Sequence, residues 1–389
     1  MAGTGAIVVY SDGIYHGGCG RYNRAMLWLL RDLGEDPWFV HTTRDYPRDH
    51  DFPEHRTVYL PTTMPGLSAE DAGKVAVLRV LRLFQELAPR AVIFSNGSCY
   101  SNLAAKRTAF MLGLPVLTIE HNAFEGLIQW HRATANEAMA HYQLAKAAVC
   151  VSEYNRDTIT RILECPQETA VTIHNFVPDD IIDAPPSSRV GGVRQSLGVA
   201  PGDILVVSSG SLTDAKGVGM ILDLVEQDQA WVRSRRVKFR WAGKPLDPGY
   251  LREVQQRIEA AGATDVFSIV GWIESITDFL DAADIFLLPS YNEAFCLAIA
   301  EAMARSRPVI TTDRGGIPEV TGDLARLVQK PWVETLRAQL TWMLDNPGER
   351  ERLGAAGRWR VRERFTQARW VADWESLLRR HALLPGGVA

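Results

Sequence analysis

Two glutamates lie eight positions apart in an otherwise apolar segment, SYNEAFCLAIAEAMA, which runs from Ser290 to Ala304. Glu293 falls in the first turn of the helix that this segment predicts, with Ser290 or Asn292 as cap, where a carboxylate stabilises the helix dipole. Glu301 has apolar neighbours on every side, so it is expected to be buried and to need hydrogen-bond donors such as sugar hydroxyls. On one helix the two carboxylates would lie about 12 Å apart, which is of the order of a diphosphate bridge between two sugars.

A lysine follows another apolar run. Lys216 lies in GSLTDAKG, residues 210–217, directly after ILVVSS. If ILVVSS is a parallel strand, Lys216 lies just beyond its carboxyl end, where α/β sheets bind ligands, and its compact ammonium suits a diphosphate. A solvated lysine at a helix start fits the same residues. The segment lacks G-x-x-x-x-G-K-[ST], which excludes a nucleotide-triphosphatase loop.

Two glycine-rich turns follow other apolar runs. HGGCGRYNRAML, residues 16–27, comes after the first run, and its glycines would let the backbone approach a phosphate or polar ligand at a helix N-terminus. Asn23 stands where the dinucleotide fingerprint needs its third glycine, which argues against that motif, and a turn without a ligand fits equally well. In TTDRGGIPEV, Gly315 and Gly316 predict a second tight backbone approach.

The sequence favours no metal site. Asp49-His50-Asp51 has the D-x-D form of metal-dependent sugar transferases, but it lies in the polar segment RDYPRDHDF, where a solvated loop is expected. The nine histidines form no H-E-x-x-H pattern, and the five cysteines form no C-x-x-C. We therefore expect neither a bound metal nor a disulfide framework.

Charge and hydropathy argue against a nucleic-acid-binding protein and against a membrane-spanning one. A net charge of −4 gives no sign of the basic excess that accompanies nucleic-acid binding. The apolar runs fall far short of the ~20 residues of a membrane span, and the N-terminus resembles no signal peptide. A cytoplasmic protein is expected. The basic run RSRRVKFRW, residues 233–241, could contact an anionic membrane surface, although a solvated helix end running into a strand fits it better.

The elements that must position these residues follow from an alternating pattern. Short β-branched runs alternate with longer amphipathic segments along the chain, as in parallel α/β sheets. The series is interrupted by DDIIDAPPSSRVGGV, whose composition suits a linker, and 389 residues are enough for two cores. We predict an N-terminal Rossmann-like domain over residues 1–185, a C-terminal one over residues 195–365, and a last amphipathic segment over residues 366–389.

Taken together, these motifs resemble the retaining glycosyltransferases of family 4, which have the GT-B fold. The resemblance is strongest in GWIESITDFLDAADIFLLPSYNEAFCLAIAEAMARSRPVITTDRGGIPEV, residues 271–320, which combines the paired glutamates with the di-glycine. It implies an α/β protein of two doubly wound domains facing each other across a cleft. It also implies that the C-terminal helix crosses back to the N-terminal domain.

The same resemblance assigns roles to individual residues. Glu301 would bind the ribose hydroxyls of a sugar nucleotide and Glu293 the hydroxyls of the transferred sugar, while Lys216 would bind the diphosphate. His121 would lie near the anomeric centre, so His121, Glu293 and Lys216 are the expected catalytic residues. The remaining donor-binding positions are Gly17, Gly18, Ser211, Trp272, Phe295, Cys296 and Leu297.

Ser211 departs from the family pattern, which has an arginine at this position beside the diphosphate. The lost charge would weaken stabilisation of the leaving group unless another cation, such as Lys244 or Arg314, replaces it. Acceptors are expected to bind to loops of the N-terminal domain, through a polar and aromatic lining that suits a polyhydroxylated molecule. Its residues are Asn96, Ser98, Tyr100, Glu125 and Trp130.

The resulting hypothesis is an enzyme, a hexosyltransferase that moves a sugar to an acceptor glycan or small polyhydroxylated molecule. The donor is a nucleotide-diphosphate sugar, with a UDP-sugar favoured over a GDP-sugar. The expected reaction retains the anomeric configuration and needs neither metal nor cofactor, and Ala- and Arg-rich usage suits a bacterial biosynthetic enzyme. Alternatives on the same fold are a sugar-nucleotide epimerase, a phosphorylase, or a catalytically weak binding or scaffold relative.

Overall fold

The computed structural model describes residues 5–12, 17–43, 52–61, 69–126, 132–330 and 332–384. The chain divides into two compact units. Unit 1 comprises Met1–Asn175 and Trp370–Ala389, and unit 2 comprises Phe176–Arg369. Each unit is described by itself below.

Unit 1 is built on a seven-stranded parallel sheet in the order β3-β2-β1-β4-β5-β6-β7. The strands are β1 (Ile7–Ser11), β2 (Trp38–His41), β3 (Thr57–Tyr59), β4 (Ala91–Asn96), β5 (Val116–Glu120), β6 (Ala147–Cys150) and β7 (Ala170–Thr172). β1, β4, β5 and β6 are buried along their whole length, which explains their continuous apolar runs.

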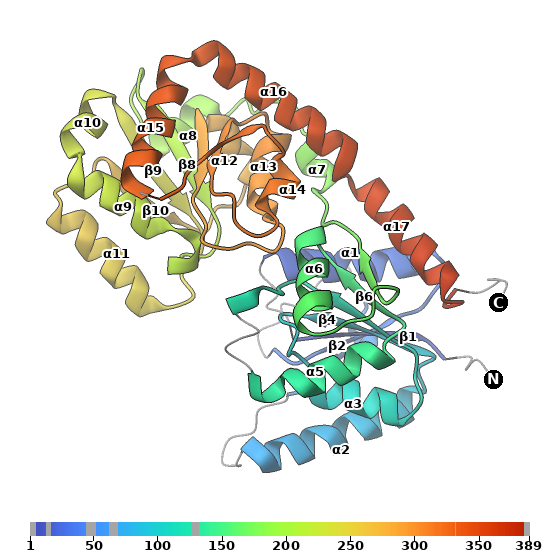
Figure 1. Cartoon of the computed structure of the whole chain (residues 1–389). Helices are drawn as coiled ribbons and strands as arrows, with labels where there is room; N and C mark the ends of the chain where they lie inside the picture. The colour runs from blue at the N-terminus through green and yellow to red at the C-terminus, as the bar shows by residue number, and fades with distance from the viewer. Residues whose placement is uncertain are drawn as a thin grey trace. The chain divides into compact units, whose positions relative to one another are not determined.

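Helices cover both faces of the unit 1 sheet. They are α1 (Gly18–Asp32), α2 (Ala69–Leu87), α3 (Leu103–Met111), α5 (Arg132–Leu144), α6 (Glu153–Ile162), the short 3-10 helix η1 (Glu54–Arg56) and most of α17 (Gln367–Arg380). Figure 1 shows α1 and α6 on one face and α2, α3 and α5 on the other. The core beneath α2 and α3 includes Tyr10, Phe84 and Phe94.

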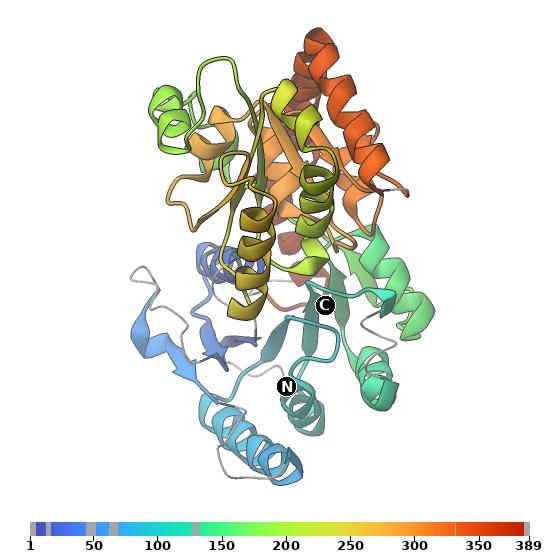
Figure 2. The same cartoon turned by 90° about the vertical axis from the view of Figure 1, so that its left-hand side faces the viewer.

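Unit 2 is built on a six-stranded parallel sheet in the order β10-β9-β8-β11-β12-β13. The strands are β8 (Ile204–Ser209), β9 (Val237–Ala242), β10 (Phe267–Gly271), β11 (Ile285–Leu288), β12 (Val309–Thr311) and β13 (Ala325–Leu327). Figures 1 and 2 show α9 (Val218–Gln227) and α11 (Pro248–Ala260) along one face of this sheet. The other helices are α7 (Asp179–Ile182), α8 (Val190–Ser196), α10 (Gln229–Ser234), α12 (Ile276–Ala282), α13 (Leu297–Ala304), α14 (Ile317–Thr321), α15 (Trp332–Asp345) and α16 (Pro347–Arg364), with the 3-10 helix η2 (Asp214–Lys216).

The two sheets share one topology, and the predicted pair of doubly wound, Rossmann-like domains is confirmed. In each sheet the first three strands run outward in one direction and the later strands in the other, so the order reverses beside the first strand. The reversal lies between β1 and β4 in unit 1 and between β8 and β11 in unit 2. Ligands of doubly wound proteins bind at the carboxyl ends of the strands at such a point.

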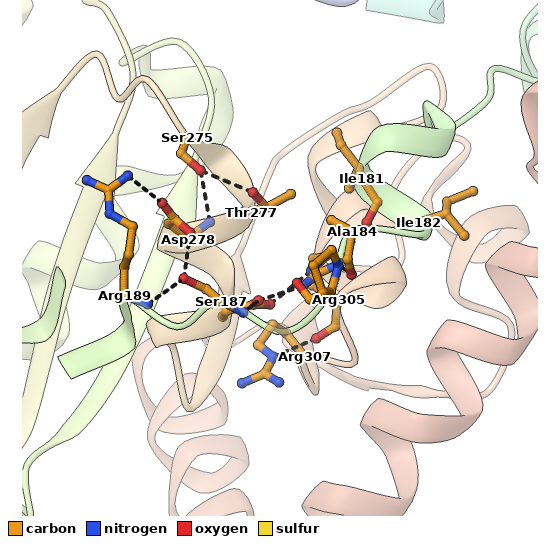
Figure 3. A network of polar contacts seen from close by, with 12 residues as sticks. Ile181, Ile182, Ala184, Ser187, Arg189, Ser275, Thr277, Asp278, Arg305 and Arg307 are labelled. Atoms are coloured by element: carbon orange, nitrogen blue, oxygen red, sulfur yellow. Dashed lines mark hydrogen bonds and ion pairs between the residues drawn. The ribbon is translucent and has the colours of Figure 1, made fainter. Parts of the chain in front are cut away.

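The proline- and serine-rich segment after α7 is held within unit 2 by one buried arginine (Figure 3). Arg305 is 3% exposed and donates to both carboxylate oxygens of Asp281, at 2.9 and 2.5 Å. The same guanidinium donates to the carbonyls of Ile181, Ala184 and Pro185. This single side chain therefore satisfies three backbone acceptors in a segment with little regular structure.

We predict that Arg305→Ala destabilises unit 2 by about 3–5 kcal/mol, because the side chain of Asp281, only 9% exposed, loses its ionic partner and three backbone carbonyls lose their donor. Hydrogen exchange of peptides from residues 176–369, measured against urea concentration, gives the free energy. Arg189→Ala is the matched control, since Arg189 pairs with Asp278 from an exposed position and its loss should cost about 1 kcal/mol or less. Equal effects of the two substitutions would contradict the assigned role of Arg305.

Candidate functional site

An ion pair lies at the point where the strand order of unit 2 reverses. Lys216 ends η2, just after β8, and Glu293 follows β11. The Lys216 Nζ lies 2.5 Å from the Glu293 Oε1, and the Ser290 hydroxyl donates to the same oxygen at 2.8 Å. The two charged groups predicted from separate motifs are therefore brought into direct contact.

The surroundings of Lys216 keep it protonated. Burial acts to lower the pKa of its ammonium, but the carboxylate of Glu293 outweighs that effect and the pKa lies above its usual value. The side chain of Lys216 remains 28% exposed, whereas that of Glu293 is 10% exposed. Lys216 is therefore a fixed positive charge that a ligand can still reach.

Glycines hold the backbone on both sides of this ion pair. Gly217 has φ of 76°, and a Cβ there would lie 2.0 Å from the Pro289 carbonyl oxygen. Gly315 has φ of 62°, and its Cβ would lie 2.0 Å from the Glu293 carbonyl oxygen. That oxygen also accepts a hydrogen bond from the Gly316 N–H at 2.8 Å. Only glycine, which lacks a side chain, allows the backbone to come this close to a carbonyl oxygen. The tight backbone approach that the sequence predicts at Gly315-Gly316 is made to the backbone of Glu293.

One local prediction is wrong: Glu293 is not in a helix. α13 begins at Leu297, and Cys296 precedes it with the left-handed φ of 76°, so residues 290–296 have no regular structure. The backbone of Glu293 pairs with Gly316 instead of with a following helical turn. The assignment of Glu293 as a first-turn acid, and the 12 Å spacing along a single helix, do not hold. The predicted burial of Glu301 is confirmed, at 4% exposure within α13.

The loop that contains Ser211 packs directly against the loop after β9. A Cβ on Gly243 would lie 1.9 Å from the Gly210 carbonyl oxygen, and the Leu212 N–H donates to the Lys244 carbonyl at 3.0 Å. The Lys244 ammonium lies 5.2 Å from the ring centroid of Trp272, which is 59% exposed. An ammonium from the loop after β9 and an aromatic ring from the loop after β10 therefore lie together, and the first of these loops is bonded to the loop of Ser211.

The second candidate cation occupies a different place. Arg314 follows β12 and pairs with Asp313 at 3.4 Å. Its guanidinium also lies 5.9 Å from the ring centroid of Trp332. Of the two cations considered for Ser211, Lys244 is thus the one whose backbone is bonded to the Ser211 loop.

In unit 1, His121 follows β5 and is 7% exposed. Its Nε2 lies 2.9 Å from the Ser95 hydroxyl, and the ring of Tyr22 meets the imidazole edge-on with centroids 4.9 Å apart. Burial lowers the pKa of His121 to about 4. The imidazole is therefore neutral at neutral pH and does not add to the positive charge of the protein.

A carboxylate that the motif analysis did not select lies at the same edge. Asp12 follows β1, and its Oδ1 accepts hydrogen bonds from the Gly97 N–H at 2.9 Å and the Asn102 amide at 3.4 Å. Its position directly after the first buried strand was the signal that could have identified it. Gly17, with φ of 119°, precedes α1, and Gly18 is the first residue of that helix.

The predicted acceptor residues differ in exposure. Asn96 is fully buried, and its amide donates to Glu120 at 2.8 Å. The Ser98 N–H donates to the Ser101 hydroxyl in a local turn, whereas Glu125 is exposed and pairs with Arg161 at 3.4 Å. Tyr100 is partly buried, which raises its pKa to about 12. Trp130 and the Asp49-His50-Asp51 motif lie outside the described residues.

The described part of the chain has neither a cluster of metal-binding side chains nor a membrane-spanning helix. Across those residues, no three His, Cys, Asp or Glu side chains gather closely enough to hold a metal ion. No helix there is both long and apolar enough to cross a bilayer.

Two family models match the chain. The model for Glycosyltransferase Family 4 covers residues 16–181, and that for Glycosyl transferases group 1 covers residues 193–360. Together they span most of both units.

The chain is also similar to individual proteins of known name. An alpha-maltose-1-phosphate synthase of Mycobacterium tuberculosis is 26% identical over 74% of this chain and 78% of its own length. An alpha-D-kanosaminyltransferase of Streptomyces kanamyceticus is 23% identical over 70% of this chain and 72% of its own. The Anabaena protein Alr3699/HepE, solved in complex with UDP and glucose, superimposes with a TM-score of 0.82 at 17% identity, over 96% of this chain and all of that one.

We predict that His121 stays neutral until the pH falls well below 6. Because its folded pKa of about 4 lies below the unfolded value of 6.5, protons favour the unfolded chain, and stability is lost as the pH falls through this window. Nitrogen-15 NMR of histidine-labelled protein measures the titration, with His121→Gln used to assign the signal. A midpoint near 6.5 would contradict the buried, neutral imidazole.

Proposed function

Since this chain belongs to the family 4 glycosyltransferases, we propose that it transfers a sugar from a nucleotide-diphosphate sugar to an acceptor hydroxyl, with retention of configuration. The chain is a hexosyltransferase of this GT-B type, and our proposal concerns its sugar donor and its mechanism. The observation that carries the proposal is the Lys216–Glu293 pair at the strand reversal of unit 2. A UDP-sugar is the favoured donor, in line with the UDP complexes of a protein with the same fold.

Lys216 would stabilise the leaving diphosphate. The ammonium has three N–H donors and uses one on Glu293, so the others can reach phosphate oxygens. Its position is set before the donor binds, because Glu293 and the Gly217 turn hold it. Charge that develops on the diphosphate as the glycosidic bond breaks would then be stabilised without reorganisation of the protein.

The two glutamates would bind opposite parts of the donor. Glu301, buried within α13, is assigned to the ribose hydroxyls, which can donate to its carboxylate. Glu293 is assigned to hydroxyls of the transferred sugar, since its carboxylate lies beside the ammonium that would hold the diphosphate. The backbone N–H groups of Phe295, Cys296 and Leu297 precede or begin α13 and would donate to the same ligand.

Lys244 would supply the second positive charge. The residue at Ser211 is uncharged, but the Lys244 backbone is bonded to the neighbouring Leu212. With Lys216 and Lys244 together, the site has two ammonium groups for a diphosphate, and the proposed mechanism uses no metal or cofactor. Trp272, beside Lys244, offers an exposed aromatic face on which a nucleobase can stack.

The proposed chemistry is attack from the face that the diphosphate leaves. The anomeric C–O bond to the diphosphate breaks, the acceptor oxygen bonds to the anomeric carbon, and a diphosphate oxygen takes the acceptor proton. Glu293 is committed to Lys216 and Ser290 and is assigned to positioning and not to nucleophilic attack. A neutral His121 would contribute a hydrogen bond to the donor sugar.

We predict that Glu301→Gln and Glu293→Gln affect different steps. Glu301→Gln should weaken UDP binding at least tenfold, because the ribose loses a charged acceptor worth about 1.5–3 kcal/mol. Glu293→Gln should lower kcat about 10²-fold and leave the Kd for UDP within about threefold, since UDP lacks the transferred sugar and the amide oxygen of glutamine can still accept a hydrogen bond from Lys216. Calorimetry with UDP and steady-state rates with a UDP-sugar separate the two.

Glu259→Gln is the control for these measurements, because Glu259 is exposed on α11 of the same unit. Unchanged UDP affinity in Glu301→Gln would refute the ribose assignment. Conversion of the donor to another nucleotide sugar without an acceptor would identify an epimerase instead. Failure of the wild-type protein to bind any nucleotide sugar would favour a binding or scaffold role.

A second prediction concerns the cations. Lys216→Ala should lower kcat by about 10²–10³-fold, as loss of one preorganised charge-stabilising donor does, and Lys244→Ala by about tenfold. Arg314→Ala should leave kcat near the wild-type value, because Arg314 is engaged with Asp313 and Trp332. A large effect of Arg314→Ala with none from Lys244→Ala would reverse the assignment of the second cation.

A further inference from the structure

The imidazole of His121 is constrained by side chains from two elements. Ser95, on β4, forms a hydrogen bond with Nε2 at 2.9 Å. Tyr22, on α1, meets the ring edge-on with an interplanar angle of 81°. Because rotation of the imidazole would break the first contact and collide with the second, its orientation is held by its neighbours.

Tyr22 is in turn held by the last helix of the chain. The indole N–H of Trp374, on α17, donates to the Tyr22 hydroxyl at 2.7 Å. The ring of Trp370 meets the ring of Tyr22 edge-on, with centroids 5.1 Å apart. Tyr22, Trp370 and Trp374 are 3%, 2% and 0% exposed, so close packing leaves the tyrosine little freedom.

These contacts leave one nitrogen of His121 for a ligand. Among the described residues, Ser95 is the only hydrogen-bond partner of the imidazole, and it uses Nε2. Since the ring is neutral, one nitrogen donates and the other accepts, and the bond to Ser95 therefore decides which role Nδ1 can play. Nδ1 can make one hydrogen bond of fixed direction.

We propose that Tyr22, held by Trp374, is a positioning residue that orients His121 toward the bound donor sugar. This inference rests on the proposed function, in which His121 forms a hydrogen bond to that sugar. A displacement of about 1 Å at a reacting centre can cost about 10²-fold in rate, so a side chain that fixes the imidazole affects turnover without touching substrate. α17 thereby contributes to the site through Tyr22.

The test compares Tyr22→Leu, Tyr22→Phe and Trp374→Phe with the wild-type protein. Tyr22→Leu removes the ring against His121 and should lower kcat about tenfold, with the Kd for UDP within twofold. Tyr22→Phe keeps the ring and should retain at least a third of kcat. Tyr22→Phe and Trp374→Phe each remove the same hydrogen bond, so the double variant should be no slower than the slower single variant.

Nitrogen-15 NMR of His121 provides a readout that loss of stability alone does not change. In the wild-type protein the two ring nitrogens should show one dominant neutral tautomer, and in Tyr22→Leu the signals should shift toward the tautomer average. Leu378→Ala is the matched control, since it removes another fully buried side chain of α17, one that takes no part in the hydrogen bond or ring contacts of Tyr22 described above. It should lower the Tm and leave kcat and the His121 signals unchanged.

Two outcomes would overturn the proposal, and they differ in meaning. If Tyr22→Leu lowers the Tm but leaves kcat and the His121 signals at wild-type values, Tyr22 is only a packing residue and the proposed function stands. If the wild-type protein binds no nucleotide sugar, the proposed function fails, and the positioning role fails with it.

Discussion

The ion pair between Lys216 and Glu293 is the interaction on which the arrangement of the site depends. The two residues are 77 positions apart in sequence and meet because β8 and β11 are neighbours at the reversal of the strand order. A lysine and a glutamate placed there separately would each incur a desolvation cost. Paired with Glu293, Lys216 keeps its positive charge and leaves part of its ammonium open to a ligand. The doubly wound topology therefore brings Glu293 to Lys216, and this pairing offsets the desolvation of an ammonium that a ligand can still reach.

The loops around the pair owe their shape to backbone contacts that side chains would prevent. Gly217 closes against Pro289, Gly315 against Glu293, and Gly243 against Gly210. Cys296, with its left-handed φ, ends this irregular stretch and directly precedes α13. A non-glycine residue in that conformation costs about 1–3 kcal/mol and tends to occur at functional sites. This strain fits the proposed role of the segment, in which its backbone N–H groups donate to the bound donor.

The fold was predictable from sequence because it rests on local signals. Buried parallel strands require continuous apolar runs, and the crossover helices require amphipathic segments. The alternation of these two kinds of segment along the chain was therefore sufficient to predict the two doubly wound domains. The burial of Glu301 followed from its apolar neighbours for the same reason. Glu293 was misassigned to a helix because its irregular backbone depends on a hydrogen bond from Gly316, which local preference cannot show. Asp12 was missed because its partners, Gly97 and Asn102, come from another strand and loop.

In the proposed reaction, the charged groups of unit 2 and the neutral histidine of unit 1 have different roles. Unit 2 contributes Lys216, whose ammonium is held by Glu293, and in the proposed reaction Lys244 adds a second positive charge for a ligand with two phosphates. The unit 1 edge contributes a neutral histidine, since burial keeps the His121 pKa near 4. A cationic imidazole beside an anomeric carbon that develops positive charge would raise the barrier by like-charge repulsion. Burial of His121 keeps the ring neutral, and the contacts of the ring with Ser95 and Tyr22 hold its orientation, so the same surroundings have both effects.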